Sequence, residues 1–265
     1  MLRVLFIGDI VGRGGRRAVR EVLPSLKKEL SLDFVIANGE NAAGGIGINP
    51  EKAEELFSMG IDVITTGNHI WKKREILPYL ERHPRLLRPA NYPSGAPGKG
   101  GAVYKLSNGL KVAVLNLEGR VFMRPLESPF KVAEQYIEIL RQQTPLIIVD
   151  FHAEATSEKM ALGWYLDGLV SAVLGTHTHV QTSDERILPQ GTAYITDVGM
   201  TGPINSVIGM KKEIAIQGFL SQLPNRFEVA SGEVELQGVY LELDEGSGKA
   251  ISIKRIKRRP EGENG

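Results

Sequence analysis

Residues 2–9 read LRVLFIGD, an apolar run that has the pattern of a buried strand and stops at Asp9. Further along the chain, other apolar runs end in the same way, each at an amide, carboxylate or imidazole side chain. Those runs stop at Glu40-Asn41, Asn68-His69, His152 and His177-Thr178-His179. In an open α/β sheet, ligands bind outside the carboxyl ends of the strands. We therefore expect these side chains to converge on one rim, as a two-metal hydrolytic centre requires.

The length and composition of the chain limit the kinds of protein that it can be. The 265 residues, 42% of them hydrophobic, are enough for a large core. No Pro/Ser-rich linker divides the chain, so we expect a single domain over residues 1–265. The formal net charge of +1 does not indicate a strongly basic nucleic-acid-binding protein.

The absence of cysteine and the shortness of the apolar runs indicate where in the cell the protein is expected. The chain has no cysteine, which excludes disulfides and thiolate metal sites and suits a reducing cytoplasm. The N-terminal apolar run is too short for a signal peptide or a membrane span. We therefore expect a cytoplasmic protein without membrane contact.

Strand and helix patterns alternate along the chain. Asn49-Pro50 and Ser128-Pro129 are typical helix starts, and Asn108-Gly109 is typical of a hairpin turn. The expected helices cover residues 16–30, 51–59 and 131–142, and the expected hairpins join 102–106 to 112–117 and 233–243 to 250–256. This order predicts a layered α/β sandwich with an added antiparallel portion.

His177 and His179 form an i, i+2 pair, so both imidazoles face one side of an extended segment. Such a pair alone is more often structural than metal-binding. Asp9 and Glu40 at equivalent strand ends favour the metal interpretation, because a buried carboxylate must be paired or bind a cation. Asp9 is also compatible with a helix N-cap, whereas Glu40 is a poorer cap and could span two ions.

Several polar residues near these strand ends allow two interpretations. The glycine-rich loop around Arg13 fits no nucleotide-binding motif, yet its arginines and helix start could bind a phosphate. A flexible turn with solvated arginines is equally compatible.

Asp150 and Asp197 could orient an imidazole or cap a turn. Residues 199–206 have the composition of a substrate-side loop, and the basic residues 254–259 that of a protected edge strand.

Taken together, the ordered motifs resemble those of the calcineurin-like metallophosphoesterases. Along nearly the whole chain they are most similar to the bacterial YmdB family of binuclear enzymes. Val11 replaces the histidine of the usual Asp-x-His motif, and Glu40 replaces the usual bridging aspartate. Asn41 stands where it could supply the ligand that Val11 lacks. Ile70 replaces the acidic residue that usually follows the asparagine-histidine pair.

The resemblance implies a calcineurin-like metallophosphoesterase fold and two metal ions, with iron or manganese expected. One ion would be held by Asp9, Glu40, Asn41 and His179, and the other by Glu40, Asn68, His152 and His177. The expected reaction is hydrolysis of 2′,3′-cyclic nucleotides or related phosphodiesters by a hydroxide that the two metals activate. His69 would remain uncoordinated and act as the general acid.

Substrate contacts are expected from Arg13, Thr178 and Ser206. The expected partner is a small phosphodiester or cyclic nucleotide, and an RNA end or a homo-oligomer is also compatible with the sequence. Two other functions stay open at this point. One is a phosphomonoesterase or nuclease that uses the same site, and the other is a regulatory RNA- or nucleotide-binding protein with little turnover.

Overall fold

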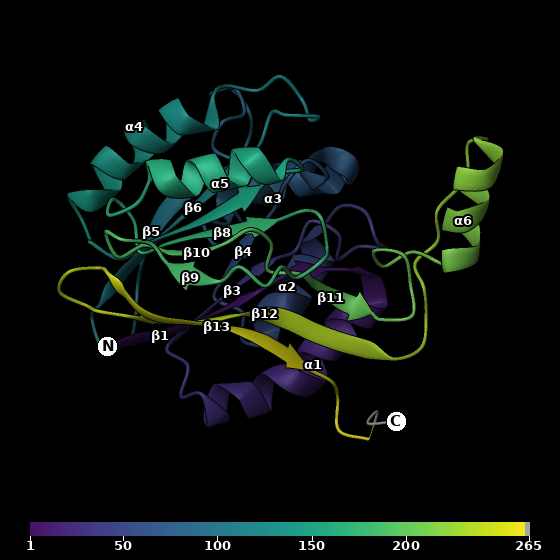
Figure 1. The fold of residues 1–265 in the computed structure, drawn as a ribbon, viewed down its shortest axis with the longest axis horizontal. Helices are drawn as coiled ribbons and strands as arrows, with labels where there is room; N and C mark the ends of the chain where they lie inside the picture. Colours follow the sequence, from purple (N-terminus) through teal and green to yellow (C-terminus); the bar gives the residue numbers. More distant parts are fainter. Residues whose placement is uncertain (263–265) are drawn as a thin grey trace.

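The computed structural model describes residues 1–262 and contains two β-sheets that face each other, with helices on their outer sides (Figure 1). The first sheet has the order β2-β11-β12-β1-β3-β4, with β13 paired to β12. Its strands are β1 (Leu2–Ile7), β2 (Asp9–Ile10), β3 (Phe34–Asn38), β4 (Val63–Thr65), β11 (Met200–Pro203), β12 (Val234–Leu243) and β13 (Ala250–Arg258).

The second sheet has the order β5-β6-β7-β8-β10-β9. Its strands are β5 (Gly101–Lys105), β6 (Lys111–Glu118), β7 (Ile147–His152), β8 (Ala172–Thr176), β9 (Arg186–Ile187) and β10 (Ala193–Ile195). The α-helices are α1 (Gly12–Glu29), α2 (Pro50–Ser58), α3 (Leu77–Arg82), α4 (Pro129–Arg141), α5 (Thr156–Tyr165) and α6 (Lys212–Ser221). Two short 3-10 helices, η1 (Ile70–Lys72) and η2 (Arg74–Ile76), precede α3.

The apolar runs are continuous because most of these strands are buried on both faces. In β1, Val4 and Phe6 point into the core between the sheets, whereas Leu5 and Ile7 pack under α1 and α2. The core between the sheets takes side chains from β1 and β3 on one side and from β6, β7 and β8 on the other. On the outer side of the second sheet, α4 and α5 cover a separate apolar layer.

The predicted helices and hairpins are present with small shifts at their ends. Asn49 caps α2, and its side chain accepts a hydrogen bond from the backbone N–H of Lys52. Ser128 occupies the cap position of α4 but makes no such bond. Residues 199–206, which we expected to form a loop, contain strand β11, which runs parallel to β2.

Two features differ from the expected arrangement. The ligand-bearing strand ends do not share one sheet, because β1, β3 and β4 belong to the first sheet and β7 and β8 to the second. The antiparallel portion is also built into the fold, since β12 lies between β11 and β1. The prediction that residues 1–265 form one domain stays a prediction.

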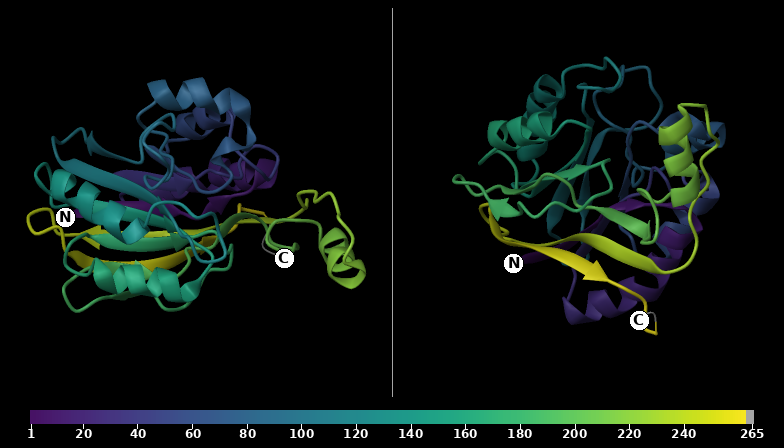
Figure 2. Two further views of the ribbon diagram at one scale, coloured as in Figure 1. Left: turned by 90° about the horizontal axis from the view of Figure 1, so that it is seen from above. Right: turned by 45° about the vertical axis from the view of Figure 1, so that its right-hand side comes forward.

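An arm of residues 204–232, which carries α6, extends from the rest of the molecule (Figure 2). The sequence patterns did not predict this helix. No helix among residues 1–262 is both long and apolar enough to cross a membrane.

Candidate metal centre

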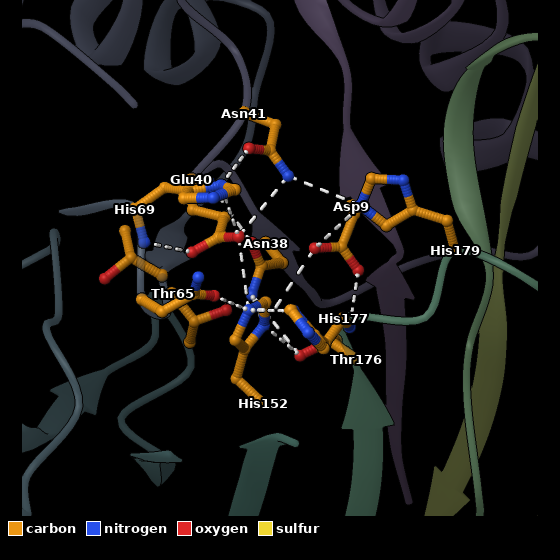
Figure 3. A network of polar contacts seen from close by, with 12 residues as sticks. Asp9, Asn38, Glu40, Asn41, Thr65, His69, His152, Thr176, His177 and His179 are labelled. Carbon is orange, nitrogen blue, oxygen red and sulfur yellow. Dashed lines mark hydrogen bonds and ion pairs between the residues drawn. The ribbon is translucent and has the colours of Figure 1, made fainter. Parts of the chain in front are cut away.

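The two sheets bring their carboxyl-terminal strand ends to one place (Figure 3). From the first sheet come Asp9, which opens β2, and the residues that follow β3 and β4. From the second sheet come His152, the last residue of β7, and the segment that follows β8. The residues assembled in this way are Asp9, Glu40, Asn41, Asn68, His69, His152, His177 and His179.

Glu40 lies at the middle of this group and is fully buried. Its Oε1 atom is 3.1 Å from Nε2 of His152 and 3.1 Å from Nδ1 of His69. Its Oε2 atom accepts a 2.9 Å hydrogen bond from the backbone N–H of His69. Burial would raise the pKa of Glu40, but its contacts with His152 and His69 outweigh this effect and hold the pKa well below its ordinary value. The carboxylate is therefore ionised and ready to bind a cation.

Three side chains already have the spacing of a metal site. Ligand atoms of Glu40, His152 and His177 all lie within 4.8 Å of one another. Nε2 of His152 is 3.0 Å from Oδ1 of Asn68 and 3.0 Å from Nδ1 of His177. Burial and the neighbouring His152 lower the pKa of His177 to about 3. The His177 ring is therefore neutral, which is the form that binds metals.

Asp9 lies close to His177 and His179, on the opposite side of the residue group from His69 (Figure 3). It is fully buried, and burial raises the pKa of its carboxyl group. Oδ2 accepts a 3.1 Å hydrogen bond from the backbone N–H of His177, whereas Oδ1 has no hydrogen-bond partner within residues 1–262. Nε2 of His179 lies 3.7 Å from this Oδ1 and 3.3 Å from Nδ2 of Asn41. A buried carboxylate oxygen without a donor is costly, and a bound cation would remove that cost. The donor set therefore fits metal ions.

His69 contacts Glu40 but does not belong to the three residues whose ligand atoms all lie within 4.8 Å of one another. It occupies the N-cap position of η1, and its side chain is 26% exposed. Its Nδ1 atom lies 2.7 Å from Oδ1 of Asn41. If Nδ1 carries the proton that this contact needs, Nε2 is left free for another partner.

The segment that holds the last two histidines is strained. His177 and His179 have φ values of 103° and 65°, a region that residues other than glycine seldom adopt. Between them, Thr178 donates from its N–H and its hydroxyl to Oδ2 of Asp197, at 3.0 and 2.8 Å. Lys159 donates to the same oxygen at 2.8 Å. Asp197 therefore fixes the backbone between the histidines and also accepts from the N–H of Gly199 at 2.9 Å, which agrees with the turn-capping role and not with the imidazole contact that the sequence also allowed.

Asp150 is connected to His152 through the side chain of Thr176. The Thr176 hydroxyl donates to Oδ1 of Asp150 at 2.7 Å and lies 2.9 Å from Nδ1 of His152. Asn38 donates to the other carboxylate oxygen at 3.1 Å. Burial raises the pKa of Asp150 to about 7. Asp150 thus orients the hydroxyl of Thr176, and this hydroxyl contacts the Nδ1 atom of His152.

Sequence reasoning missed two charged residues here. Lys159 is almost fully buried, although its position on α5 gave no sign of this. Glu118 ends β6 next to His152 and is also buried, and its carboxylate oxygens have no hydrogen-bond partner within residues 1–262. Burial raises the pKa of Glu118 to about 7. The apolar run over residues 112–117 could have pointed to Glu118, since it ends in a carboxylate as the other runs do.

The three residues predicted to contact substrate lie in different surroundings. Arg13 is exposed at the start of α1. The hydroxyl of Thr178 is engaged with Asp197. Ser206 donates to the carbonyl of Pro203 and lines a cavity of about 440 Å³ together with His179. Contact of these three residues with substrate stays a prediction.

Comparison with known proteins gives the family. The sequence profile of the YmdB-like proteins matches residues 5–256. The chain belongs to the YmdB-like family. Its two-sheet architecture agrees with the calcineurin-like metallophosphoesterase fold that the motifs had implied.

Relatives of this YmdB-like chain match it over nearly its whole length. A 2′,3′-cyclic-nucleotide 2′-phosphodiesterase of Bacillus subtilis is 53% identical over 255 residues, which cover 96% of each chain. A hypothetical protein of Thermus thermophilus has a crystal structure with a TM-score of 0.92 and 42% identity, over 98% of this chain and all of that one. A novel phosphatase from Mycoplasma pneumoniae has a TM-score of 0.91 and 38% identity, over 97% of this chain and 93% of that one.

Proposed function

We propose that this chain is a metal-dependent phosphodiesterase that hydrolyses 2′,3′-cyclic nucleotides or related phosphodiesters. The convergence of Glu40, His152 and His177, whose ligand atoms lie within 4.8 Å of one another, carries the proposal. The 53% identity to the Bacillus subtilis 2′,3′-cyclic-nucleotide 2′-phosphodiesterase supports the same substrate class.

The side chains divide into two ligand sets that share Glu40. Asp9, Asn41 and His179 would hold one ion with Glu40, and Asn68, His152 and His177 would hold the other. Imidazole nitrogens mixed with carboxylate and amide oxygens suit iron or manganese. Two ions in such a site polarise the phosphoryl oxygens and supply a nucleophilic water near neutral pH.

His69 would serve as the general acid. It lies beside Glu40 and Asn41 but outside the ligand cluster, and it is exposed enough to reach a substrate. With Nδ1 held by Asn41, the Nε2–H of the protonated ring is free to donate to the oxygen that leaves phosphorus. A cyclic phosphate opens to an alkoxide, a strong base, and a placed proton donor accelerates its departure by roughly 10²–10⁴-fold.

Phosphomonoester hydrolysis is the second candidate. A structural relative with 38% identity is described as a phosphatase. The two activities differ in the charge of the substrate, because a monoester is a dianion near neutral pH and a diester is a monoanion. We favour the diester because the B. subtilis relative, with its higher identity of 53%, is a phosphodiesterase.

Turnover of matched substrates tests the proposal. The protein, supplied with Mn²⁺ or Fe²⁺, should open 2′,3′-cyclic AMP with a higher kcat/KM than it shows for 3′-AMP. Glu40→Gln should remove most of this activity, whereas Glu138→Gln, which changes an exposed residue on α4, should not. Faster hydrolysis of the monoester, or full activity in Glu40→Gln, would contradict the proposed function.

A further inference from the structure

Two adjoining cavities lie beside α1, outside the metal centre. The larger, of about 980 Å³, lies between α1 and the returning part of the arm at residues 226–232. The smaller, of about 340 Å³, lies between α1 and the segment that leads into α2. Arg13 and Gly44 line both cavities, so together they form one groove, here called the α1 groove.

The α1 groove is positively charged although the whole chain is nearly neutral. Four arginines and two glutamates line the larger cavity. Four arginine or lysine residues and one glutamate line the smaller one. The formal net charge of the chain is only +1, so cationic side chains are concentrated at this place.

Some of these cations already have partners. Arg16, Arg20 and Lys52 all pair with Glu55. By contrast, the side chains of Arg13, Lys73 and Arg226 form no hydrogen bond or close ion pair within residues 1–262, although Arg226 interacts electrostatically with Glu228. Three cations that line one groove and form no close ion pair are available to an anionic ligand with several charges.

The same groove contains an exposed aromatic ring. Phe227 is 58% exposed and lines the larger cavity next to Arg226. Nucleobases stack on exposed aromatic rings while cations follow the phosphates, and this combination is typical of single-strand binding sites.

The floor of the α1 groove is continuous with the metal-binding loop. Gly44 follows Asn41 by three residues, and the N–H of Gly12 donates to the Asn41 carbonyl at 2.9 Å. Arg16 donates to the carbonyl of Ala42. No atom lies within 4 Å of the place where a side chain on Gly44 would begin, so the groove is open there. A strand bound along α1 could therefore lead toward the metal centre.

We propose that the α1 groove binds the sugar-phosphate backbone of a single-stranded RNA whose 2′,3′-cyclic phosphate end occupies the metal centre. This inference rests on the proposed function and names a substrate class for the same site. A 2′,3′-cyclic phosphate requires a 2′-hydroxyl, so a polymer that ends in one is RNA. Its phosphates on the 5′ side would meet Arg13, Arg226 and Lys73.

The chemistry of the substrate indicates the kind of reaction that supplies it. In RNA cleavage by the internal 2′-hydroxyl, a bond forms between O2′ and phosphorus while the bond from phosphorus to O5′ breaks. The proton of the 2′-hydroxyl passes to the departing O5′, which leaves a cyclic end on one fragment. Ring opening then consumes one water and breaks one P–O bond of the ring. The enzyme would thus act after an RNA cleavage in which the internal 2′-hydroxyl is the nucleophile.

The experiment compares a decamer RNA that has a 2′,3′-cyclic phosphate end with 2′,3′-cyclic AMP, using the metal-loaded protein. The variant is Arg226→Ala/Lys73→Ala, and the control is Lys105→Ala/Lys111→Ala, which removes two exposed cations from the second sheet. The groove variant should lose roughly tenfold in kcat/KM on the decamer at 0.15 M salt. Its turnover of the cyclic mononucleotide, and both activities of the control, should stay unchanged.

Salt dependence gives a second readout that does not need turnover. Binding of a decamer with a 3′-hydroxyl end should weaken with salt, and the slope of log Kd against log salt should fall by about 1.4 in the groove variant, about 0.7 for each lost phosphate contact. Equal losses on both substrates, or an unchanged decamer slope, would overturn the RNA proposal. Absence of 2′,3′-cyclic AMP hydrolysis by the unaltered protein would instead refute the proposed function. The salt dependence of decamer binding would still show whether the α1 groove binds RNA.

Discussion

At the scale of single residues, the chemistry depends on how His69 is placed beside the ligand cluster. His69 directly follows Asn68, yet its ring contacts Asn41 and Glu40 and lies outside the cluster of Glu40, His152 and His177. The sequence predicted which side chains meet, because each one ends an apolar run. The contacts between the side chains could not be predicted, since they depend on rotamers and on loops such as residues 177–179.

Replacement of His69 tests the general-acid role. His69→Ala should lower kcat for 2′,3′-cyclic AMP by roughly 10²–10⁴-fold and leave the metal content unchanged. A diester with a nitrophenol leaving group needs no proton, so the variant should lose much less on that substrate. His83→Ala serves as the control, because His83 lies in a loop and stacks on Tyr79. Equal losses on the two substrates would refute the role.

At the scale of elements, a buried ion pair joins α5 to the loop after β10. Lys159 of α5 and Asp197 are both almost completely buried, and together they hold Thr178 between the two strained histidines. Lysine is rarely buried, and the two residues are separated by 38 positions. The pairing of two residues so far apart in the chain leaves no signal in the local sequence pattern. The sequence therefore did not predict the ion pair.

Removal of both partners should cost less stability than the two single removals added together. Asp197→Asn leaves the Lys159 ammonium buried without a counter-charge, so the free energy of unfolding should fall by about 3–5 kcal/mol. Lys159→Met/Asp197→Asn should lose less than the sum of the two single variants. Urea denaturation of the four proteins measures these values. Additive losses would show that the pair is not coupled.

At the scale of the whole molecule, the candidate centre joins the two sheets. Asp9, Glu40 and Asn68 follow strands of the first sheet, and His152 and His177 come from the second. Apolar runs show that a strand is buried on both faces, but they do not show which strand lies beside it. The division into two sheets, and the insertion of β12 between β11 and β1, depend on pairings between distant residues.

Ligands from both sheets should couple metal binding to the stability of the fold. A bound metal stabilises the native state by RT ln(1 + [L]/Kd), about 2.7 kcal/mol at a free concentration of 100 times Kd. Addition of Mn²⁺ to the metal-free protein should therefore raise the Tm. Glu40→Ala should abolish the increase, and Glu138→Ala should retain it. A Tm that does not respond to metal would show that the sheets are not linked through the site.

The most direct test of the shared-carboxylate centre is the number of metal ions bound per chain, measured by elemental analysis after saturation and removal of free metal. We expect two transition-metal ions in the unaltered protein, close to none in Glu40→Ala, and about one in Asn41→Ala, which removes a ligand of a single ion. One ion in the unaltered protein, or two ions retained by Glu40→Ala, would contradict a centre in which two ions share Glu40.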